Sequence, residues 1–419
     1  MDIHEAKNLV VKAGIELVES GLIARTWGNV SCRIDESRFV ITPSGRSYLS
    51  LIPDEIIIVN IADCSYIGDI KPSSEKGIHA EVYKLYPDIN FVIHTHQENA
   101  SVISATGLDS IKIEGHTCLG KQVICADYAL PGTKSLRRNV YSALERSTGK
   151  AVIMKNHGAL CFGKNYDEAF LVAFELEKAC HDYILKQYFK LSGKNRFNAV
   201  EMSNFALSLH NKQEDENNLS IFENYPNSKR TENGFIMYLD DSNAGAGLCA
   251  YPLAESGKQK EEIEFTKTDF TVAEEIKMYK AIYNKIYNEH KNINHIILKT
   301  TPEMKAISNY GIELRPLLDD FAQIVGIIAK NVENNPVKIT AALKKSSVVF
   351  VKNLGALCCG KTEEDAIAVS MVAQKACKAY IGASLFGKVK PINPLECLLM
   401  RYIYLKKYSK LAEREKPKA

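Results

Sequence analysis

Residues 155–164 read KNHGALCFGK and residues 352–361 read KNLGALCCGK, so eight of ten positions are identical 197 residues apart. A weaker match lies upstream of each copy, where residues 88–96 (DINFVIHTH) align with residues 292–300 (NINHIILKT), 204 residues apart. A spacing of this size is that of whole domains and not of short solenoid repeats. The sequence therefore predicts one domain that occurs twice in tandem.

The boundaries of the two copies follow from composition. Residues 211–234 are dense in Asn, Glu, Lys and Ser, and the hydrophobic pattern stops there, which predicts a polar linker. We expect domain one at residues 1–210 and domain two at 235–395. A C-terminal helix with a charged tail is expected at 396–419.

Composition limits the kinds of partner. The chain has 53 Lys and Arg against 50 Asp and Glu, which gives no basic footprint for nucleic acid or an anionic membrane. No apolar run approaches the roughly 20 residues of a membrane span, and no signal peptide is recognisable at the N-terminus. The eleven scattered cysteines are typical of buried thiols in a reducing compartment. We therefore expect a cytoplasmic protein that binds neither nucleic acid nor membranes.

Helical and β-strand patterns are mixed along domain one, which favours a layered α/β fold. Ser73 or Ser74 is expected to cap a helix that Pro87 ends. The expected helices cover 2–20, 73–86, a segment beginning at 98, and 167–191, and the expected strands cover 39–42, 55–59, 91–94, 151–154 and 159–162.

Three histidines are the candidates for chemistry. His94 and His96 stand two apart at the end of an expected strand, so both imidazoles lie on one face. His157 sits in a tight turn after another strand, and Glu75 stands near a helix start. Three histidines with one exchangeable position are typical of catalytic zinc. The pair alone also fits two histidines on the solvent face of an edge strand, and the remaining histidines, His79 among them, are given no role.

The second copy separates these alternatives. The residues aligned with the three histidines are Leu298, Thr300 and Leu354, although Gly-Ala-Leu-Cys is kept beside the last of them. A shared metal ion explains why all three change together. The internal comparison predicts that domain one binds a metal and that domain two has lost it.

Hydroxyl-rich segments form a second candidate site. They are Thr26–Ser31, Thr42–Gly45 and Ser73-Ser74, all at expected strand ends or helix starts. Hydroxyls, backbone N–H groups and a helix N-terminus suit a phosphate dianion, although turn and cap chemistry explains any one of these segments. In the second copy Ser73-Ser74-Glu75 is expected to align with Ala273-Glu274-Glu275, where Glu274 would repel a phosphate.

Five motifs together resemble the class II aldolase/adducin family over residues 5–205. They are Gly28-Asn29-Val30-Ser31, Thr42-Pro43-Ser44-Gly45, Ser73-Ser74-Glu75, His94-Thr95-His96 and Asn156-His157-Gly158. The resemblance implies a layered α/β/α domain with a central, mainly antiparallel sheet, here duplicated in tandem with a degenerate second copy. It also implies homo-oligomers with active sites between subunits.

The resemblance assigns roles to the site residues. His94, His96 and His157 would bind one zinc ion per chain, with Glu75 as a fourth ligand that becomes the acid/base when substrate displaces it. The substrate phosphate would be held by Asn29, Ser44, Gly45, Ser73 and Ser74.

The implied reaction is the zinc-dependent cleavage of a phosphorylated ketose, of the L-fuculose-1-phosphate kind, through a metal-stabilised enediolate. Fuculose-phosphate aldolases take a proton donor tyrosine from the neighbouring subunit, and the stretch Ile113–Thr117 has none, so His116 or Glu114 is the expected acid. The alternatives are a pentulose-phosphate 4-epimerase or a thio-sugar-phosphate dehydratase of the same family, or a non-catalytic adducin-like interaction module. Domain two would replace a neighbouring subunit, or would be a regulatory or structural appendage.

Overall fold

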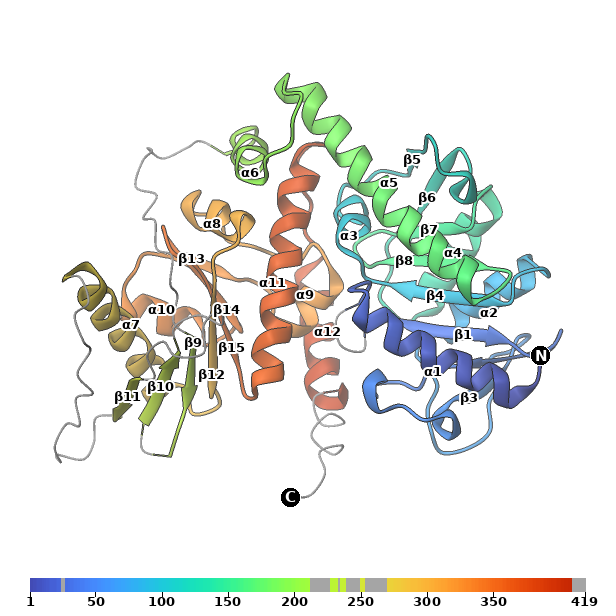
Figure 1. The fold of residues 1–419 in the computed structure, drawn as a ribbon, viewed down its shortest axis with the longest axis horizontal. Coiled ribbons are helices and arrows are strands. Elements are labelled where there is room, and N and C mark those ends of the chain that lie inside the picture. Colours follow the sequence, from blue (N-terminus) through green and yellow to red (C-terminus); the bar gives the residue numbers. More distant parts are fainter. Residues whose placement is uncertain (24–26, 212–226, 233, 239–248, 253–269, 409–419) are drawn as a thin grey trace. The chain divides into compact units, whose positions relative to one another are not determined.

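The computed structural model describes the chain except residues 24–26, 212–226, 233, 239–248, 253–269 and 409–419 (Figure 1). The chain forms two compact units. The first contains Met1–Phe197, Leu317–Gln323 and the chain from Lys378 onward, and the second contains Asn198–Pro316 and Ile324–Cys377. A short segment from within the second repeat, Leu317–Gln323, therefore folds as part of the first unit.

The first unit is built on an eight-stranded sheet of order β3-β2-β1-β4-β8-β7-β6-β5. All neighbouring strands pair antiparallel except β6 and β7, which are parallel. The strands are β1 (Asn29–Arg33), β2 (Arg38–Ile41), β3 (Ile57–Asn60), β4 (Phe91–Thr95), β5 (Ser110–Lys112), β6 (Gln122–Ala126), β7 (Ala151–Met154) and β8 (Ala159–Gly163). The mainly antiparallel sheet is as expected.

Helices cover both faces of this sheet. One face packs on α2 and α4, whose apolar residues share a core with Val92 of β4 and Leu160 of β8. On the other face Phe91 of β4 contacts Tyr166 of α5, at 5.5 Å between ring centroids, and Figure 1 shows α1 and α5 crossing the sheet. The helices of this unit are α1 (Ile3–Glu19), α2 (Lys76–Leu85), α3 (Glu98–Ser104), α4 (Lys134–Arg146), α5 (Tyr166–Ser192), α9 (Asp319–Ile324) and α12 (Pro394–Ile403). The layered α/β/α architecture is thus confirmed.

Local chemistry sets the ends of these helices. The Asp2 carboxylate accepts the N–H groups of His4 and Glu5 and begins α1, as Asp does at an N-cap. The expected cap of α2 is wrong: Glu75 is the N-cap residue, and Ser73 Oγ instead accepts the Glu75 N–H at 3.2 Å. This turn holds Glu75 at the very start of the helix.

The repeated decapeptide forms the same hairpin in both units. In the first, Asn156 adopts a left-handed conformation (φ 58°) between β7 and β8, and Asn353 does so in the second (φ 62°). Asparagine tolerates that conformation better than most residues. A Cβ atom on Gly158 would lie 2.3 Å from the Thr95 carbonyl oxygen, so only glycine fits where the hairpin meets β4.

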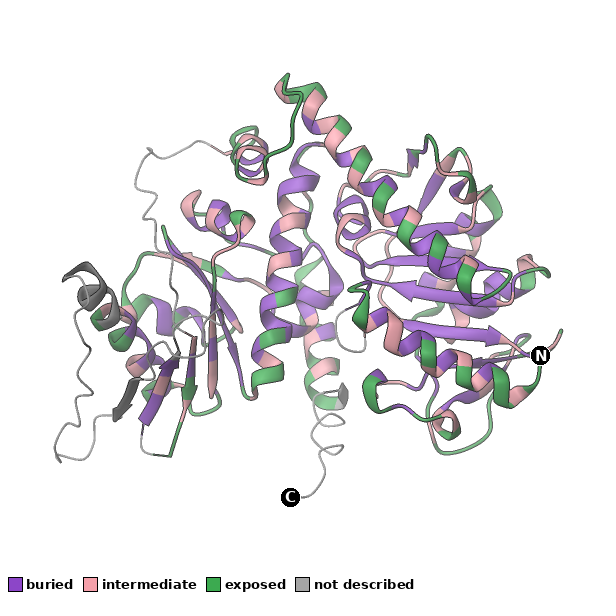
Figure 2. Cartoon of the chain, in the orientation of Figure 1, coloured by how far each residue is buried: buried purple, intermediate pink, exposed green. Residues whose placement is uncertain are grey.

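The second unit repeats the architecture with a seven-stranded sheet of order β11-β10-β9-β12-β15-β14-β13. Its strands are β9 (Asn227–Arg230), β10 (Gly234–Tyr238), β11 (Cys249–Pro252), β12 (His295–Lys299), β13 (Lys330–Val332), β14 (Val348–Val351) and β15 (Gly355–Gly360). Its helices are α6 (Ala199–Ser208), α7 (Phe270–Glu289), α8 (Pro302–Asn309) and α10 (Pro336–Ala342), and α11 (Glu363–Ser384) ends in the first unit. Figure 2 shows that most strands of the first unit are largely buried, and in the second unit β14 and β15 are buried throughout.

The polar linker ends earlier than composition indicates. Most of residues 211–226 lie outside the described residues, as does the tail from 409. Residues 227–230, in contrast, form β9, which pairs with β10 and β12. Ser228 is buried there and its hydroxyl lies 2.8 Å from that of Tyr287, so these polar residues are part of the sheet.

A half-buried arginine that lies over a buried tyrosine ring fixes the register between the two copies. In the first unit Arg33 lies over the Tyr83 ring at 4.8 Å, and the Tyr83 hydroxyl is 2.7 Å from Ser31. In the second unit Arg230 lies over the Tyr287 ring, also at 4.8 Å. Tyr83 therefore corresponds to Tyr287, 204 residues later.

This register corrects one alignment. Counting back along α2 and α7 from the paired tyrosines places Tyr279 opposite Glu75, so the expected match with Glu275 is wrong by four residues. Tyr279, Leu298 and Leu354 all belong to one hydrophobic core of the second unit. The positions that carry Glu75, His94 and His157 in the first unit are thus filled with apolar bulk in the second.

None of the helices among the described residues has the length and apolar character needed to cross a bilayer.

Candidate metal centre

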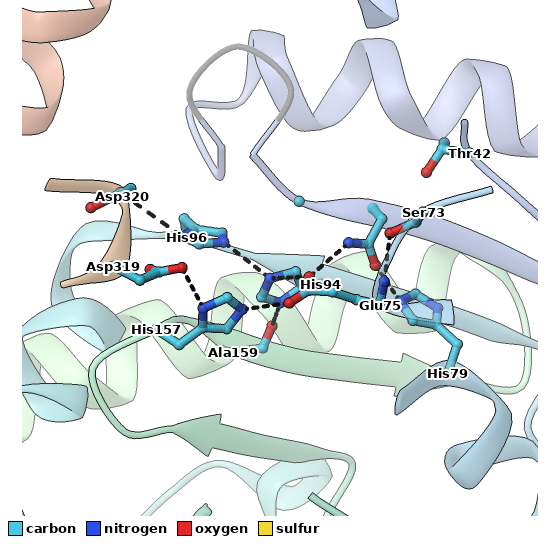
Figure 3. Close-up of polar contacts among 12 residues, drawn as sticks. Thr42, Ser73, Glu75, His79, His94, His96, His157, Ala159, Asp319 and Asp320 are labelled. Carbon is cyan, nitrogen blue, oxygen red and sulfur yellow. Dashed lines mark hydrogen bonds and ion pairs between the residues drawn. The ribbon is translucent and has the colours of Figure 1, made fainter. Parts of the chain in front are cut away.

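Three buried histidines converge at one end of the first sheet. His94 is on β4, His96 follows that strand, and His157 lies in the β7–β8 turn. Their potential ligand atoms all lie within 4.8 Å of one another. Because β8 pairs with β4, the hairpin carries His157 to the same end of the sheet as the other two. The predicted meeting of these residues is what the structure shows (Figure 3).

Glu75 closes the cluster from the start of α2. Its Oε1 lies 3.0 Å from His157 Nε2, and its Oε2 lies 3.3 Å from His94 Nε2. Asn29 of β1 donates its side-chain amide to Oε2 at 3.1 Å. The carboxylate is therefore buried with one oxygen toward each of two imidazoles.

The hydrogen bonds of the outer ring nitrogens orient two imidazoles. His94 Nδ1 lies 3.0 Å from the Ala159 carbonyl, which can only accept, so this nitrogen carries the proton. His157 Nδ1 lies 2.8 Å from the Asp319 carboxylate on its other side. Both Nε2 atoms therefore face Glu75, and His96 Nε2 lies 3.0 Å from that of His94. Outer hydrogen bonds of this kind commonly fix metal-binding histidines.

The electrostatics of the cluster are those of a site built for positive charge. Burial alone would raise the pKa of Glu75, but His157 and His94 hold that pKa well below its usual range. Burial alone would lower the pKa of His157, but the Asp319 and Glu75 carboxylates raise it well above its usual value. Burial lowers the pKa of His94, which favours its neutral form. Without a metal, a proton on His157 balances the two carboxylates.

These residues fit a divalent cation. Glu75 Oε1 and His157 Nε2 are buried and face each other at 3.0 Å, and within the described residues neither has a further hydrogen-bond partner. Three imidazole nitrogens with a carboxylate oxygen are a donor set that zinc accepts. Replacing the His157 proton by the cation would leave the same carboxylates to balance its charge.

The residues expected to bind phosphate lie next to Glu75 on two adjoining loops. Ser44 N–H donates to the Lys71 carbonyl and Ser73 N–H donates to the Thr42 carbonyl, both at 3.0 Å. Gly45 adopts a left-handed φ of 77° in the first loop. Ser74 is exposed at the start of α2, and Asn29 is the residue that links this region to Glu75. Thr26 lies outside the described residues.

The two expected proton donors pair with residues outside the cluster. His116 precedes the short turn Thr117–Leu119 and pairs with Glu175 of α5. Glu114 is exposed and lies 3.3 Å from Lys186. Within the described residues neither belongs to the group formed by the three histidines.

His79 was missed by the sequence reasoning. It is fully buried, with Nδ1 2.6 Å from the Ser31 hydroxyl and Nε2 on the Asn29 amide oxygen. Burial lowers the pKa of His79 to about 3, so the ring is neutral. It therefore orients Asn29, which holds Glu75. The sequence did contain one signal for a role of His79, since the equivalent residue of the second copy is Tyr283.

Asp319 and Asp320 were also missed. Both are buried in the segment that the first unit takes from the second repeat. Asp319 hydrogen-bonds His157, and Asp320 Oδ2 lies 3.9 Å from His96 Nδ1 (Figure 3). Nothing in the run Leu317–Phe321 distinguishes these acids from surface residues in the sequence.

Comparison with known proteins identifies a matching family and several similar aldolases. Residues 8–184 and 253–381 match the Class II Aldolase and Adducin N-terminal domain. The chain is 32% identical over 185 residues to the 5-deoxy-D-ribulose 1-phosphate aldolase of Bacillus thuringiensis, covering 44% of this chain and 86% of that protein. A solved L-fuculose 1-phosphate aldolase is 31% identical with a TM-score of 0.42, over 44% of this chain and 87% of that one. The L-fuculose-1-phosphate aldolase of Thermus thermophilus is 25% identical with a TM-score of 0.38, over 46% and 98%.

Proposed function

The chain belongs to the class II aldolase and adducin family, and from that premise we propose that its first unit is a zinc-dependent aldolase that cleaves a phosphorylated ketose. The observation that carries the proposal is the convergence of His94, His96 and His157 with Glu75 in one buried cluster. Relatives named as aldolases of 5-deoxyribulose 1-phosphate and fuculose 1-phosphate support the substrate class.

His94, His96 and His157 would hold the cation, with Glu75 as the fourth ligand. When bound, zinc would act as a Lewis acid that polarises the substrate carbonyl and stabilises negative charge as the carbon–carbon bond breaks. Among the residues that the structure describes, this donor set occurs in the first unit, because Leu298 and Leu354 fill two of the equivalent positions in the second. We therefore expect one zinc ion per chain.

Glu75 would move the proton. Asn29 holds Oε2, so Oε1 is the atom at which we expect the carboxylate to take and return a proton. Glu75 is 8% exposed, so little of it is open to solvent. His79 supports the arrangement by holding the Asn29 amide oxygen, which turns the amide nitrogen toward Glu75.

The substrate phosphate would lie on the two adjoining loops beside Glu75. The Ser44 and Ser73 N–H groups already donate to backbone carbonyls, so the hydroxyls of Ser44, Ser73 and Ser74 and the Gly45 backbone would make the contacts, and the N-terminus of α2 adds its dipole. Anchoring the phosphate at this distance from the cation would hold the reacting carbons in place. His116 and Glu114 remain predictions for the acid that protonates the released fragment. Homo-oligomeric assembly, a cytoplasmic location and the domain boundaries also remain predictions.

The proposal is tested by metal analysis and by product analysis on the full chain. Purified protein should contain about one zinc per chain, and it should cleave 5-deoxyribulose 1-phosphate or fuculose 1-phosphate to an aldehyde and a three-carbon ketone phosphate. Glu75→Gln should lower kcat by about 10²- to 10⁴-fold, and His94→Ala should lose the metal. Leu354→Ala, at the position of His157 in the second unit, is the matched control and should keep its zinc.

Several results would count against it. A chain without bound metal that acquires none from zinc solutions would support the non-catalytic, adducin-like alternative. Conversion of a pentulose phosphate to its epimer, or loss of water without cleavage, would identify the epimerase or dehydratase alternatives. His116→Ala and Glu114→Ala identify the acid, since the correct one lowers kcat without changing zinc content.

A further inference from the structure

We propose that the second repeat completes the metal centre of the first unit, with Asp319 as the positioning residue that holds His157 in its metal-binding orientation. This inference rests on the proposed function, because it takes His157 to be a metal ligand. It adds a residue from a part of the chain whose own copy of the centre is filled with apolar side chains.

The segment Leu317–Gln323 is held directly against the hairpin that carries His157. Asn156 donates its side-chain amide to the Leu317 carbonyl at 2.8 Å, and its own carbonyl accepts the Asp319 N–H at 3.0 Å. Leu317 and Leu318 are buried in a small apolar cluster with Ala105, Ala379 and Ala383 of the same unit. The backbone that leads into Asp319 is therefore held in place by contacts that do not involve the Asp319 side chain.

The Asp319 carboxylate is placed to control the His157 ring. Its Oδ2 lies 2.8 Å from His157 Nδ1 and also accepts the Gln323 amide at 3.2 Å. The side chain is only 2% exposed, so water competes little for this contact. With the proton kept on Nδ1, the lone pair of Nε2 faces Glu75 and the cation position. A carboxylate partner also makes the imidazole a stronger donor to the metal than a carbonyl partner would.

The loop of the first repeat that corresponds to the Asp319 segment makes different contacts. At the spacing of 204 residues, Gly107 matches Gly311, and Gly115-His116 matches Asp319-Asp320. In the first repeat His116 of this loop pairs with Glu175. Only the loop of the second repeat reaches the three histidines within the described residues. The acidic pair Asp319-Asp320 is therefore found in the second repeat, whose loop reaches the histidines, and not at the equivalent positions of the first.

Asp320 provides an internal comparison. It is adjacent in sequence and equally buried, at 1% exposed for each residue. Its Oδ2 lies 3.9 Å from His96 Nδ1, which is beyond hydrogen-bond distance. The two acids thus differ in the distance to their histidine, which is 2.8 Å for Asp319 and 3.9 Å for Asp320.

The experiment compares the zinc affinity of the full chain with that of Asp319→Asn, Asp320→Asn and His157→Ala, by competition with a chromophoric chelator. Asp319→Asn keeps the size of the side chain but removes its charge, and should weaken zinc binding by about 10- to 100-fold. It should also change the visible absorption of the cobalt-loaded protein, which a purely structural role would not do while circular dichroism stays unchanged. Asp320→Asn should weaken binding less than Asp319→Asn.

The outcomes separate the two proposals. A wild-type chain that binds neither zinc nor cobalt defeats the proposed function. A wild-type chain that binds zinc, with Asp319→Asn binding it equally well, overturns the role of Asp319 and leaves the proposed function intact. Equal losses from Asp319→Asn and Asp320→Asn would likewise overturn it, since they would reflect charge alone. If Asp319→Asn does not fold, Gln323→Leu, which removes the second hydrogen bond to Oδ2, should give a smaller loss in the same direction, and wild-type affinity in that variant would contradict the proposal.

Discussion

Replacing His157 by leucine, the residue at the equivalent position of the second unit, should destabilise the metal-free protein even though leucine is the more apolar side chain. His157 is buried between two carboxylates, 3.0 Å from Glu75 and 2.8 Å from Asp319. Removing one partner from a buried ion pair costs about 3–5 kcal/mol, because the remaining charge is left uncompensated. Burying a leucine side chain returns at most about 1.5–3 kcal/mol. The free energy lost with the ion pair is therefore larger than the free energy gained by burying leucine.

The double variant tests the cause. If the penalty comes from stranded carboxylates, His157→Leu combined with Asp319→Leu should be more stable than the sum of the two single changes predicts, by about 1–3 kcal/mol. Urea unfolding in the presence of a chelator measures this. Trp27, the only tryptophan, reports on the first unit by its fluorescence. Unchanged stability in His157→Leu, or strict additivity in the double variant, would refute the reasoning.

Three other perturbations have defined outcomes. Gly158→Ala should abolish zinc binding, because its Cβ would lie 2.3 Å from a backbone oxygen of β4, whereas Gly355→Ala, with a clash at 2.4 Å in the second unit, should lower stability but keep the metal; melting curves and zinc content distinguish them. His79→Phe should lower kcat more than it lowers zinc content, since it frees Asn29 but removes no ligand; equal losses would contradict this. The pKa of His157 is raised in the folded state, so its stabilising contribution is complete below the unfolded value of about 6.5 and is lost as pH rises through the folded pKa. The difference in melting temperature between metal-free wild type and His157→Leu should therefore shrink at alkaline pH.

The sequence was sufficient for the architecture and for the core of the site. Period-two spacing placed His94 and His96 on one face, and the repeated decapeptide predicted the hairpin that brings His157 beside them. Both inferences rest on local geometry, which short motifs determine. The register between α2 and α7 could not be predicted in this way, because sequence identity is sparse there. The Arg33–Tyr83 and Arg230–Tyr287 contacts of the structure reveal it.

Asp319 could not have been found in the same way. Its contact with His157 spans 162 positions of the chain and depends on a segment leaving its own repeat to fold with another. No periodicity or spacing encodes that exchange. His79 lies between these cases, since its position on α2 was predictable, but its hydrogen bond to Asn29 depends on how the helix packs on β1.

Whether a residue occurs in both copies depends on its role. Groups that hold the fold together occur in both, including the arginine over a tyrosine and the left-handed asparagine of the hairpin. Groups that face the metal centre occur in the first copy, and Tyr279, Leu298 and Leu354 of the second fill a hydrophobic core instead.

Asp319 is an exception, because it belongs to the second copy and contacts the histidine cluster of the first. Burying a carboxylate costs free energy unless the carboxylate is paired. The hydrophobic core around Tyr279, Leu298 and Leu354 of the second unit gives Asp319 no such partner. Its partner is His157 in the first unit, where the hydrogen bond both pairs the carboxylate and holds the imidazole in one orientation. The second repeat thus lacks the histidines of the cluster but supplies a carboxylate to it, which is a reason for the chain to keep both copies if the cluster binds a metal as proposed.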